Sequence, residues 1–392
     1  MLKKRVLSLV LSLALLPLPG CAAMLERGHE TITTHVDYAV TEDESVLRAE
    51  TYQGLVSAML YFVNEHRRGG TIRLYNYTGD VEADLANARD EVMYEDPLGA
   101  FSIHGFTYDL TPILTYYEVE LRITYSRTAQ EVDSLREVTG LAGVRQELKR
   151  LVAGQEGSAA FLASYFSGDK ELVKQLLYLA CMNAPELAAH HDWNYWPMSI
   201  SLYPEAGTRR IIEVKLPPFV ADEMEDERQY AQELETAAAA ALEAAPPAGE
   251  AYTLEELAAI VRGAHGGIDP YGSNDALAAL SGEPVEARGV LLAMEYLCQQ
   301  CGIEVEYVAG DWLIVGTPEG YRHLLPQSLY RTEDGAEPGE TAPSLPLYTD
   351  QELTEMGYEW PEALHPACED YAGSARSAMN GAELSEPPQA EE

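Results

Sequence analysis

Cysteine and histidine are the most reactive side chains in this sequence, which holds five of the first and nine of the second. Cys298 and Cys301 have the C-x-x-C spacing of a redox motif, but they fall at the end of a predicted helix. A low thiol pKa requires the start of a helix, so we expect two packing thiols rather than a reactive pair. The four cysteines after Cys21 are too few for a disulfide framework in 392 residues, and their pairing stays open.

The densest group of possible metal ligands is His190-His191-Asp192, with Trp193 and Trp196 close behind. These residues would suit a metal or glycan site. Adjacent side chains diverge on a strand, however, so only a loop could bring both imidazoles to one ion. The favoured interpretation is a polar loop with packing aromatics. We expect no metal and no cofactor.

The N-terminus has the pattern of an export signal. Lys3, Lys4 and Arg5 precede an apolar run from Val6 to Leu16 that is too short to span a bilayer. The following Leu-Pro-Gly-Cys21 resembles a bacterial lipobox, whose cysteine carries two acyl chains. We expect residues 1–20 to be a signal peptide and Cys21 to anchor an extracytoplasmic protein to the cell membrane. An ordinary secretory signal with a chance cysteine is the alternative.

The net charge of −38 limits the possible partners. An acidic surface repels phosphate groups, so we expect no nucleic-acid partner. It suits a body held off the membrane, or one that binds basic partners or cations. After the signal, no segment has the roughly 18 apolar residues of a membrane-spanning helix, so the lipid is the expected membrane attachment.

The first half of the chain predicts two related α+β units, at 43–127 and 128–220, after a tether at 21–42. Asp80 and Asp169 are suited to cap helices, and helix-ending Pro97 and Pro185 follow at nearly the same offset. Matching anchors at one period indicate a repeat. We expect the helices of these units at 43–66, 80–94, 129–152 and 169–184, and the strands at 71–77, 100–108, 116–125, 158–165 and 209–216.

The second half begins with a Glu- and Ala-rich segment, 221–251, which predicts a solvated helix and a linker. Thr253 can cap the next helix, over 252–264. A further domain extends over 252–368. The tail, 369–392, is rich in Gly, Ser, Pro and Glu, and we expect it to be disordered.

Within that domain, Ser281 to Ile303 resembles the nucleophile helix of bacterial transglutaminase-like lipoproteins. In that superfamily a cysteine opens a buried helix, and a Gly-Ile pair follows about four turns later. Counting back from Gly302-Ile303 puts Gly289 on the family's glycine and Ala287 on its cysteine. A methyl group cannot supply the thiolate that attacks.

The resemblance continues through the strand Gly310 to Val315, which corresponds to the family's His-x-Trp-Asn strand. Trp312 is retained, but Gly310 stands at the histidine position. The third catalytic position, an aspartate in the family, falls at Leu325. All three catalytic positions therefore differ together, whereas the scaffold residues remain.

The family's closing elements also have counterparts. Asp350 stands in its S-D element, Tyr358 and Trp360 in its Y-x-W element, and His365 to Cys368 in its Y-P-x-C element. The ordered series covers about 115 residues, from Thr253 to Cys368. It implies an α+β protein in which two repeated units precede a papain-like, transglutaminase-like domain without its catalytic residues.

The function implied is that of a pseudoenzyme that binds or scaffolds proteins or peptides at the cell envelope. Trp312 and His323 are the expected cleft residues, and His323 is the stray catalytic candidate because it shares a strand face with Leu325. Two alternatives remain. One is an active, divergent acyl-transferase or peptidase, which would need a reactive thiol or hydroxyl. The other is a solute-binding lipoprotein with two clamshell lobes.

Overall fold

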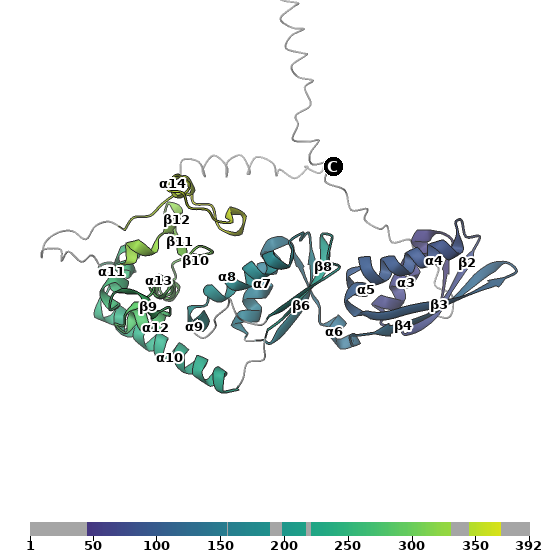
Figure 1. Ribbon diagram of the computed structural model, residues 1–392, viewed down its shortest axis with the longest axis horizontal. Coiled ribbons are helices and arrows are strands. Elements are labelled where there is room, and N and C mark those ends of the chain that lie inside the picture. Colours follow the sequence, from purple (N-terminus) through teal and green to yellow (C-terminus); the bar gives the residue numbers. More distant parts are fainter. Residues whose placement is uncertain (1–44, 155, 189–197, 217–220, 331–344, 370–392) are drawn as a thin grey trace, which may run out of the picture. The chain divides into compact units, whose positions relative to one another are not determined.

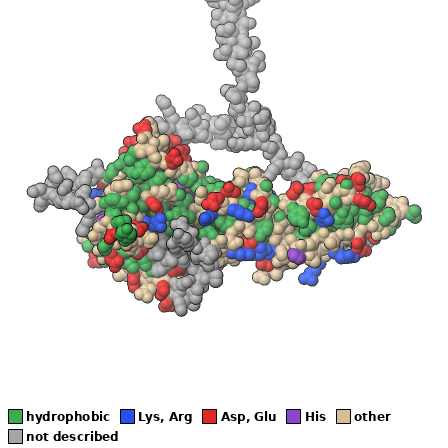
Figure 2. Space-filling model, in the orientation of Figure 1, with side chains coloured by type: hydrophobic (Ala, Val, Ile, Leu, Met, Phe, Trp, Pro, Cys, Tyr) green, Lys and Arg blue, Asp and Glu red, His purple; other side chains and the backbone are tan. Residues whose placement is uncertain are grey.

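The computed structural model describes residues 45–154, 156–188, 198–216, 221–330 and 345–369 (Figure 1). The expected signal, Cys21, the His190–Trp196 cluster and residues 370–392 lie outside this part. The fold is α+β, as expected, and the chain divides into two compact units after Ser134. Within the described residues, no helix is both long and apolar enough to span a bilayer. On the face drawn in Figure 2, acidic side chains occur in several groups on both units.

The first unit is a four-stranded sheet with helices on it. The sheet has the order β1-β2-β4-β3; β1 and β2 are parallel, and the other pairs are antiparallel. One hydrophobic core joins sheet and helices. The elements are β1 (Val46–Ala49), α3 (Tyr52–Asn64), β2 (Gly69–Tyr75), α4 (Val81–Asp90), a π-helical turn (Glu91–Glu95), α5 (Pro97–Ser102), β3 (Ile103–Ile113), β4 (Tyr116–Tyr125) and α6 (Ala129–Asp133).

The second unit starts with the same topology. Its first sheet has the order β5-β6-β8-β7, with the β5–β6 pair parallel and the other pairs antiparallel. The elements are β5 (Arg136–Thr139), α7 (Gly140–Ala153), β6 (Ser158–Ser164), α8 (Lys170–Met182), α9 (Pro185–Ala188), β7 (Ser199–Tyr203) and β8 (Arg209–Lys215).

The repeated anchors have the same local roles in both sheets. Asp80 accepts the backbone N–H of Ala83 at the start of α4, and Asp169 accepts that of Leu172 at the start of α8. Each cap satisfies an amide that would otherwise lack a partner. The two prolines, at positions 97 and 185, begin the short helices α5 and α9, where a missing N–H costs nothing.

The predictions of two helices were wrong in the first part of each range. The helix expected at 43–66 is strand β1 followed by α3, and the helix expected at 129–152 is α6, strand β5 and α7. Strand β7 was not expected at all. β1 and β5 have four residues each and lie at sheet edges, where a parallel neighbour holds them. Four residues are too few for an alternating pattern, so only the tertiary pairing reveals them.

The remainder of the second unit contains a three-stranded antiparallel sheet of order β10-β11-β12, which packs together with several helices around one buried helix. Its elements are α10 (Ala221–Ala244), α11 (Leu254–Ala264), β9 (Ile268–Ser273), α12 (Ala276–Leu280), α13 (Ala287–Gln300), β10 (Val305–Val308), β11 (Trp312–Thr317), β12 (Gly320–Leu324), a 3-10 turn (Pro326–Leu329), α14 (Asp350–Glu355) and a second 3-10 turn (Glu362–Leu364).

The two faces of this sheet have different neighbours. Leu313 and Val315 of β11 belong to the large core that contains α13, and the alternating residues Trp312 and Ile314 belong to a smaller core on the other face. Thr253 caps α11 with a full capping box, as expected. The α13 face and the opposite face therefore have to be considered as separate places for a site.

Helix α10 differs from the expectation of a solvated helix. Tyr230, Leu234 and Ala238 are buried and belong to the same core as α13. They recur every four residues, which is one face of a helix, but the surrounding Glu and Ala residues hide that periodicity in the sequence. α10 is a packed element of the second unit.

The core helix α13 carries a buried acid. Glu295 is fully buried, its Oε1 accepts a hydrogen bond of 3.4 Å from Gln299, and its Oε2 has no partner among the described residues. Burial raises the pKa of Glu295 well above its usual value, and the nearby Glu186 adds to the rise although Lys149 opposes it. Burial therefore favours the neutral, protonated form of Glu295.

We expect Glu295→Gln to stabilise the second unit at pH 7, because glutamine has a similar shape and never carries the charge that burial disfavours. The raised pKa of the folded state makes the wild type most stable below the ordinary glutamate pKa of 4.5. This stability is lost as pH rises toward the folded-state pKa, by about 1.4 kcal/mol for each pH unit. Thermal unfolding from pH 4 to 8 measures the difference. Glu359→Gln, at an exposed position, is the control. An equal Tm difference at pH 4 and pH 7 would contradict this assignment.

Candidate functional site

The start of α13 is the place where the family resemblance puts a nucleophile. Ala287 is the first residue of the helix, and the N–H of the preceding Glu286 donates to the carbonyl of Ser273 at 2.8 Å. Gly289 lets α13 approach this segment, since a Cβ there would lie 3.1 Å from the carbonyl oxygens of Ser273 and Asp275. The start of α13 is thus tightly packed against the segment from Ser273 to Asp275, but the side chain of its first residue, Ala287, is a methyl group.

A charged cluster stands next to Ala287. The Nη2 of Arg288 lies 3.6 Å from Oδ1 of Asp311, which also accepts a 2.5 Å hydrogen bond from the hydroxyl of Tyr307. Burial by itself would lower the pKa of Arg288, but Tyr178, Tyr307 and Asp311 outweigh it and raise that pKa. This cluster of arginine, aspartate and tyrosine fastens the helix start to the β10–β11 turn and contains no base suited to a thiol.

Gly310, at the family's histidine position, lies in that turn and not on the expected strand, which begins only at Trp312. Its φ of +139° is a conformation that side-chain-bearing residues rarely adopt, and a Cβ there would collide with the ring of Trp312. A histidine cannot replace Gly310 without rebuilding the turn. The backbone itself therefore excludes the second catalytic side chain.

None of the four described thiols is placed as a nucleophile. Cys181, Cys298 and Cys368 are buried and Cys301 is half-buried, and none of them forms a disulfide. Burial raises the pKa of all four, that of Cys368 to about 12. Cys298 lies 11 residues beyond Ala287, roughly 16 Å down the helix. These thiols are packing groups at pH 7, as expected for Cys298 and Cys301.

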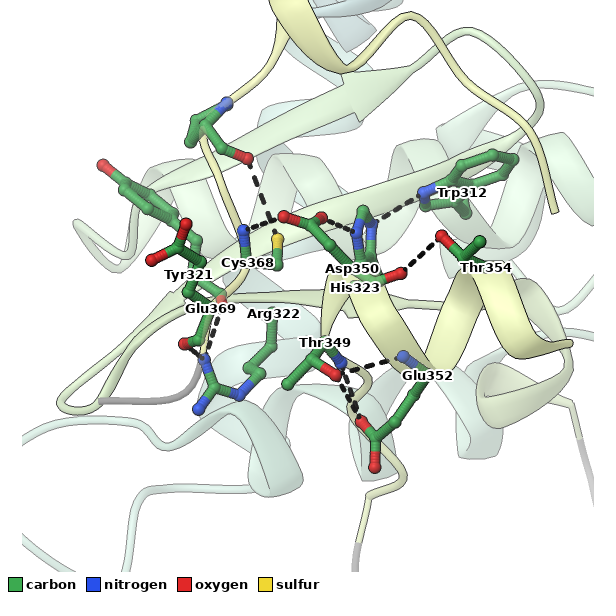
Figure 3. Close-up of polar contacts among 11 residues, drawn as sticks. Trp312, Tyr321, Arg322, His323, Thr349, Asp350, Glu352, Thr354, Cys368 and Glu369 are labelled. Atoms are coloured by element: carbon green, nitrogen blue, oxygen red, sulfur yellow. Dashed lines mark hydrogen bonds and ion pairs between the residues drawn. The ribbon is translucent and has the colours of Figure 1, made fainter. Parts of the chain in front are cut away.

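The most connected polar group lies on the other face of the sheet (Figure 3). The indole N–H of Trp312 donates to Nδ1 of His323 at 3.0 Å, and Nε2 of His323 lies 2.8 Å from Oδ1 of Asp350. The second oxygen of Asp350 accepts the backbone N–H of Cys368, also at 2.8 Å. This chain of bonds, here called the tryptophan–histidine clasp, ties strands β11 and β12 to the segment 345–369.

The clasp brings together a thiol, an imidazole and a carboxylate. Ligand atoms of His323, Asp350 and Cys368 lie within 4.8 Å of one another, the composition of both a cysteine–histidine active site and a metal site. Figure 3 shows the Cys368 sulfur beside the Asp350 carboxylate. Composition alone therefore leaves two chemical functions open.

Hydrogen-bond polarity excludes both functions for the clasp as built. An indole N–H can only donate, so Nδ1 of His323 uses its lone pair on Trp312 and the ring proton must sit on Nε2, pointing at Asp350. Burial lowers the pKa of His323 despite Asp350, which keeps the ring neutral. No lone pair is left to deprotonate Cys368 or to bind a metal ion. The clasp is a structural lock.

A second polar network joins α7 to the same tail. Glu306 of β10 accepts hydrogen bonds from Arg145 at 2.5 Å and from His365 at 2.7 Å, and Arg145 also donates to the carbonyl of Leu364. Burial would raise the pKa of Glu306, but its partners His365 and Arg145 lower it. The repeat sheet and the C-terminal segment are thus linked within one compact unit.

The cleft expected at Trp312 and His323 is not present. Trp312 is 2% exposed and His323 is 0% exposed, and rings of Tyr358 and Trp360 meet that of Trp312 edge-on. Leu325 is buried in the same small core. His323 and Leu325 do share a face, as expected, but that face is turned away from α13. Sequence reasoning noted Asp350 and Cys368 only as family elements, and it missed the bond between His323 and Asp350 and the bond from the Cys368 N–H to Asp350.

Two hollows in the described part of the second unit lie along α10. One, of about 760 Å³, opens between α10 and α12, and its wall carries the acidic side chains of Glu233, Asp275 and Glu283. A second, of about 630 Å³, lies between α10 and α11 and is lined mainly by alanines. Ala237 and Ala240 border both. The larger hollow, here called the α10 cavity, is where a ligand can reach polar groups.

Comparison with known proteins adds no relative. No protein-family model matches this chain, and a search of the curated proteins found no match. The transglutaminase-like resemblance therefore depends on the ordered residues of the sequence, and the geometry of the sites is the basis for a functional proposal.

We expect Trp312→Phe to destabilise the second unit by about 1–3 kcal/mol, because it leaves Nδ1 of the buried His323 without a donor. Trp360→Phe removes a similar ring area from the same core without removing this donor, and we expect a smaller loss. Chemical denaturation of both variants compares them. Equal losses would show that ring packing, and not the indole hydrogen bond, holds the clasp.

Proposed function

We propose that this chain is a non-catalytic, transglutaminase-like lipoprotein that binds or scaffolds proteins or peptides at the cell envelope, held to the membrane by a lipid on Cys21. The observation that carries the proposal is the start of α13, where Ala287 occupies the position of the nucleophile. The family chemistry needs a thiolate at that point, with a histidine to activate it.

Three further observations support the loss of catalysis. Gly310 has a backbone conformation that a histidine would not adopt, Leu325 is buried among apolar residues, and the described thiols have raised pKa values. The alternative cysteine–histidine pair, in the clasp, lacks a free lone pair. An active acyl-transferase would need one of these conditions to be reversed.

The α10 cavity is the proposed binding region. Its acidic wall suits a partner that presents amines or guanidinium groups, and the described residues that line it include no Lys or Arg. The scaffold of the former enzyme would position the cavity, since Asp275 caps α12 and Ser273 bonds to the residue that precedes α13. An exposed basic segment of an envelope protein or a peptide with free amines fits this chemistry.

We expect the four described thiols to react with iodoacetamide at pH 7.5 at least roughly tenfold more slowly than free cysteine, because burial keeps them protonated. Ala287→Cys is the positive control: a thiol at the helix start beside Arg288 should react faster than all four. Mass spectrometry of the chain from Ala22 onward gives the rates. Rapid alkylation of one native cysteine, with loss of an amidase or cross-linking activity, would overturn the proposal.

We expect Ala240→Trp to fill the α10 cavity and reduce binding of basic peptides or peptidoglycan fragments by at least about tenfold, the loss of a central contact. Ala239→Trp is the matched control, because Ala239 is exposed on the same helix and does not line the cavity. Isothermal titration of the soluble chain measures both. Saturable binding that Ala240→Trp leaves unchanged would place the binding region elsewhere.

A further inference from the structure

The hairpin of strands β3 and β4 in the first unit has an apolar end that the proposed function does not explain. Strands β3 and β4 pair up to Ile113 and Tyr116, so Leu114 stands in the turn between them. Leu114 is fully exposed, Ile113 is 41% exposed and Tyr117 is 40% exposed. In Figure 1 the end of this hairpin lies at the far edge of the first unit. Single exposed apolar residues are ordinary, but three within five positions form a patch.

The hairpin end is also free of charge. The eight residues from Leu110 to Tyr117 include no acidic or basic side chain, although the whole chain carries a net charge of −38. The nearest charges in the sequence are Asp109 and Glu118, and Glu118 forms an ion pair with Arg73. Placing the turn in an apolar medium would therefore remove no charged group from water.

Tyrosines form a layer behind the apolar turn. The rings of Tyr75 and Tyr116 pack with centroids 4.9 Å apart. The guanidinium carbon of Arg48 lies 4.6 Å from the ring centroid of Tyr75, and that of Arg73 lies 5.5 Å from the ring centroid of Tyr116. Apolar residues thus stand at the tip, tyrosines follow, and arginines paired with Glu50 and Glu118 come next. This order matches a bilayer from the acyl region to the charged headgroups.

The length of chain between Cys21 and the first unit favours a bilayer as the occupant of the tip. At full extension, residues 22–44 reach at most roughly 80 Å. A unit of this size has a diameter of roughly 30–40 Å. A lipid on Cys21 would therefore let any face of the first unit meet the membrane, and the apolar tip is the one that gains by doing so. A convex tip also suits a soft lipid surface.

We propose that the β3–β4 hairpin tip, Pro112 to Tyr117, inserts into the surface of the membrane to which the chain is tethered. This inference rests on the proposed membrane attachment for its occupant. Tethering supplies a high local lipid concentration, so a contact of two or three side chains is enough to orient the unit. The hairpin then fixes one end of the first unit at the bilayer.

The test places a polarity-sensitive probe beside the tip. The chain from Ala22 onward, with an N-terminal hexahistidine tag, is held on phosphatidylcholine vesicles that contain a nickel-chelating lipid. Thr115→Cys carries the probe at the tip, and Tyr94→Cys carries it at a site in the same unit that is 62% exposed. Quenching by lipids with a nitroxide on the acyl chain measures immersion.

We expect at least twofold stronger quenching at position 115 than at position 94, and loss of the difference when Ile113→Ser and Leu114→Ser are added. Equal quenching at the two positions, as expected if the tip docks on a protein or stays in water, would overturn the inference. So would quenching that survives the two serines. The tag replaces the lipid, so the result does not depend on Cys21. Mass analysis of the exported protein tests that lipid separately.

Discussion

The burial of helix α13 on every side is the constraint on which the second unit depends. All residues from Gly289 to Cys298 are buried, including an acid, and a helix that is apolar all round needs neighbours on every face. Helices α9, α11 and α12, the 3-10 turn Pro326–Leu329 and strands β9, β10 and β11 supply them. Because α9 and β10 also contact α8, the repeat sheet and the C-terminal domain belong to one compact unit. Ala287 is the first residue of α13 and is not part of the buried run, so the side chain at this position contributes little to the core.

The clasp shows that the composition of a cluster does not fix its chemistry. Ligand atoms of Cys368, His323 and Asp350 lie close enough together to bind one ion. The indole N–H of Trp312 nevertheless places the ring proton of His323 on Nε2 and leaves the ring no free lone pair. The residues that match the family's closing elements, Asp350, Trp360 and Cys368, hold the tail onto strands β11 and β12. Their position on the face opposite α13 means that they stabilise the sheet and do not complete a site beside Ala287. The α10 cavity is the part of this unit best suited to a ligand.

Much of the fold followed from local patterns. The capping residues Asp80, Asp169 and Thr253 were assigned correctly, because a cap depends on residues that are neighbours in the sequence. The edge strands β1 and β5 were missed because four residues carry no period of their own. α10 was misjudged because three buried apolar side chains among glutamates and alanines do not stand out. The bond between His323 and Asp350 joins residues 27 positions apart and has no local signal.

The sequence by itself determined that Ala287 cannot be a nucleophile, since a methyl group has no thiolate whatever surrounds it. It also determined the acidic charge and the helices whose caps and faces are local. Only the tertiary structure decided that Gly310 lies in a turn too tight for histidine, that Trp312 and His323 face away from α13, and that the charge-free hairpin end stands exposed. For Trp312 and His323 the outcome depends on which face of a strand meets which partner, since a shift of one residue in register exchanges the two faces. The other two outcomes depend on the conformation of a turn and on which elements pack around a hairpin.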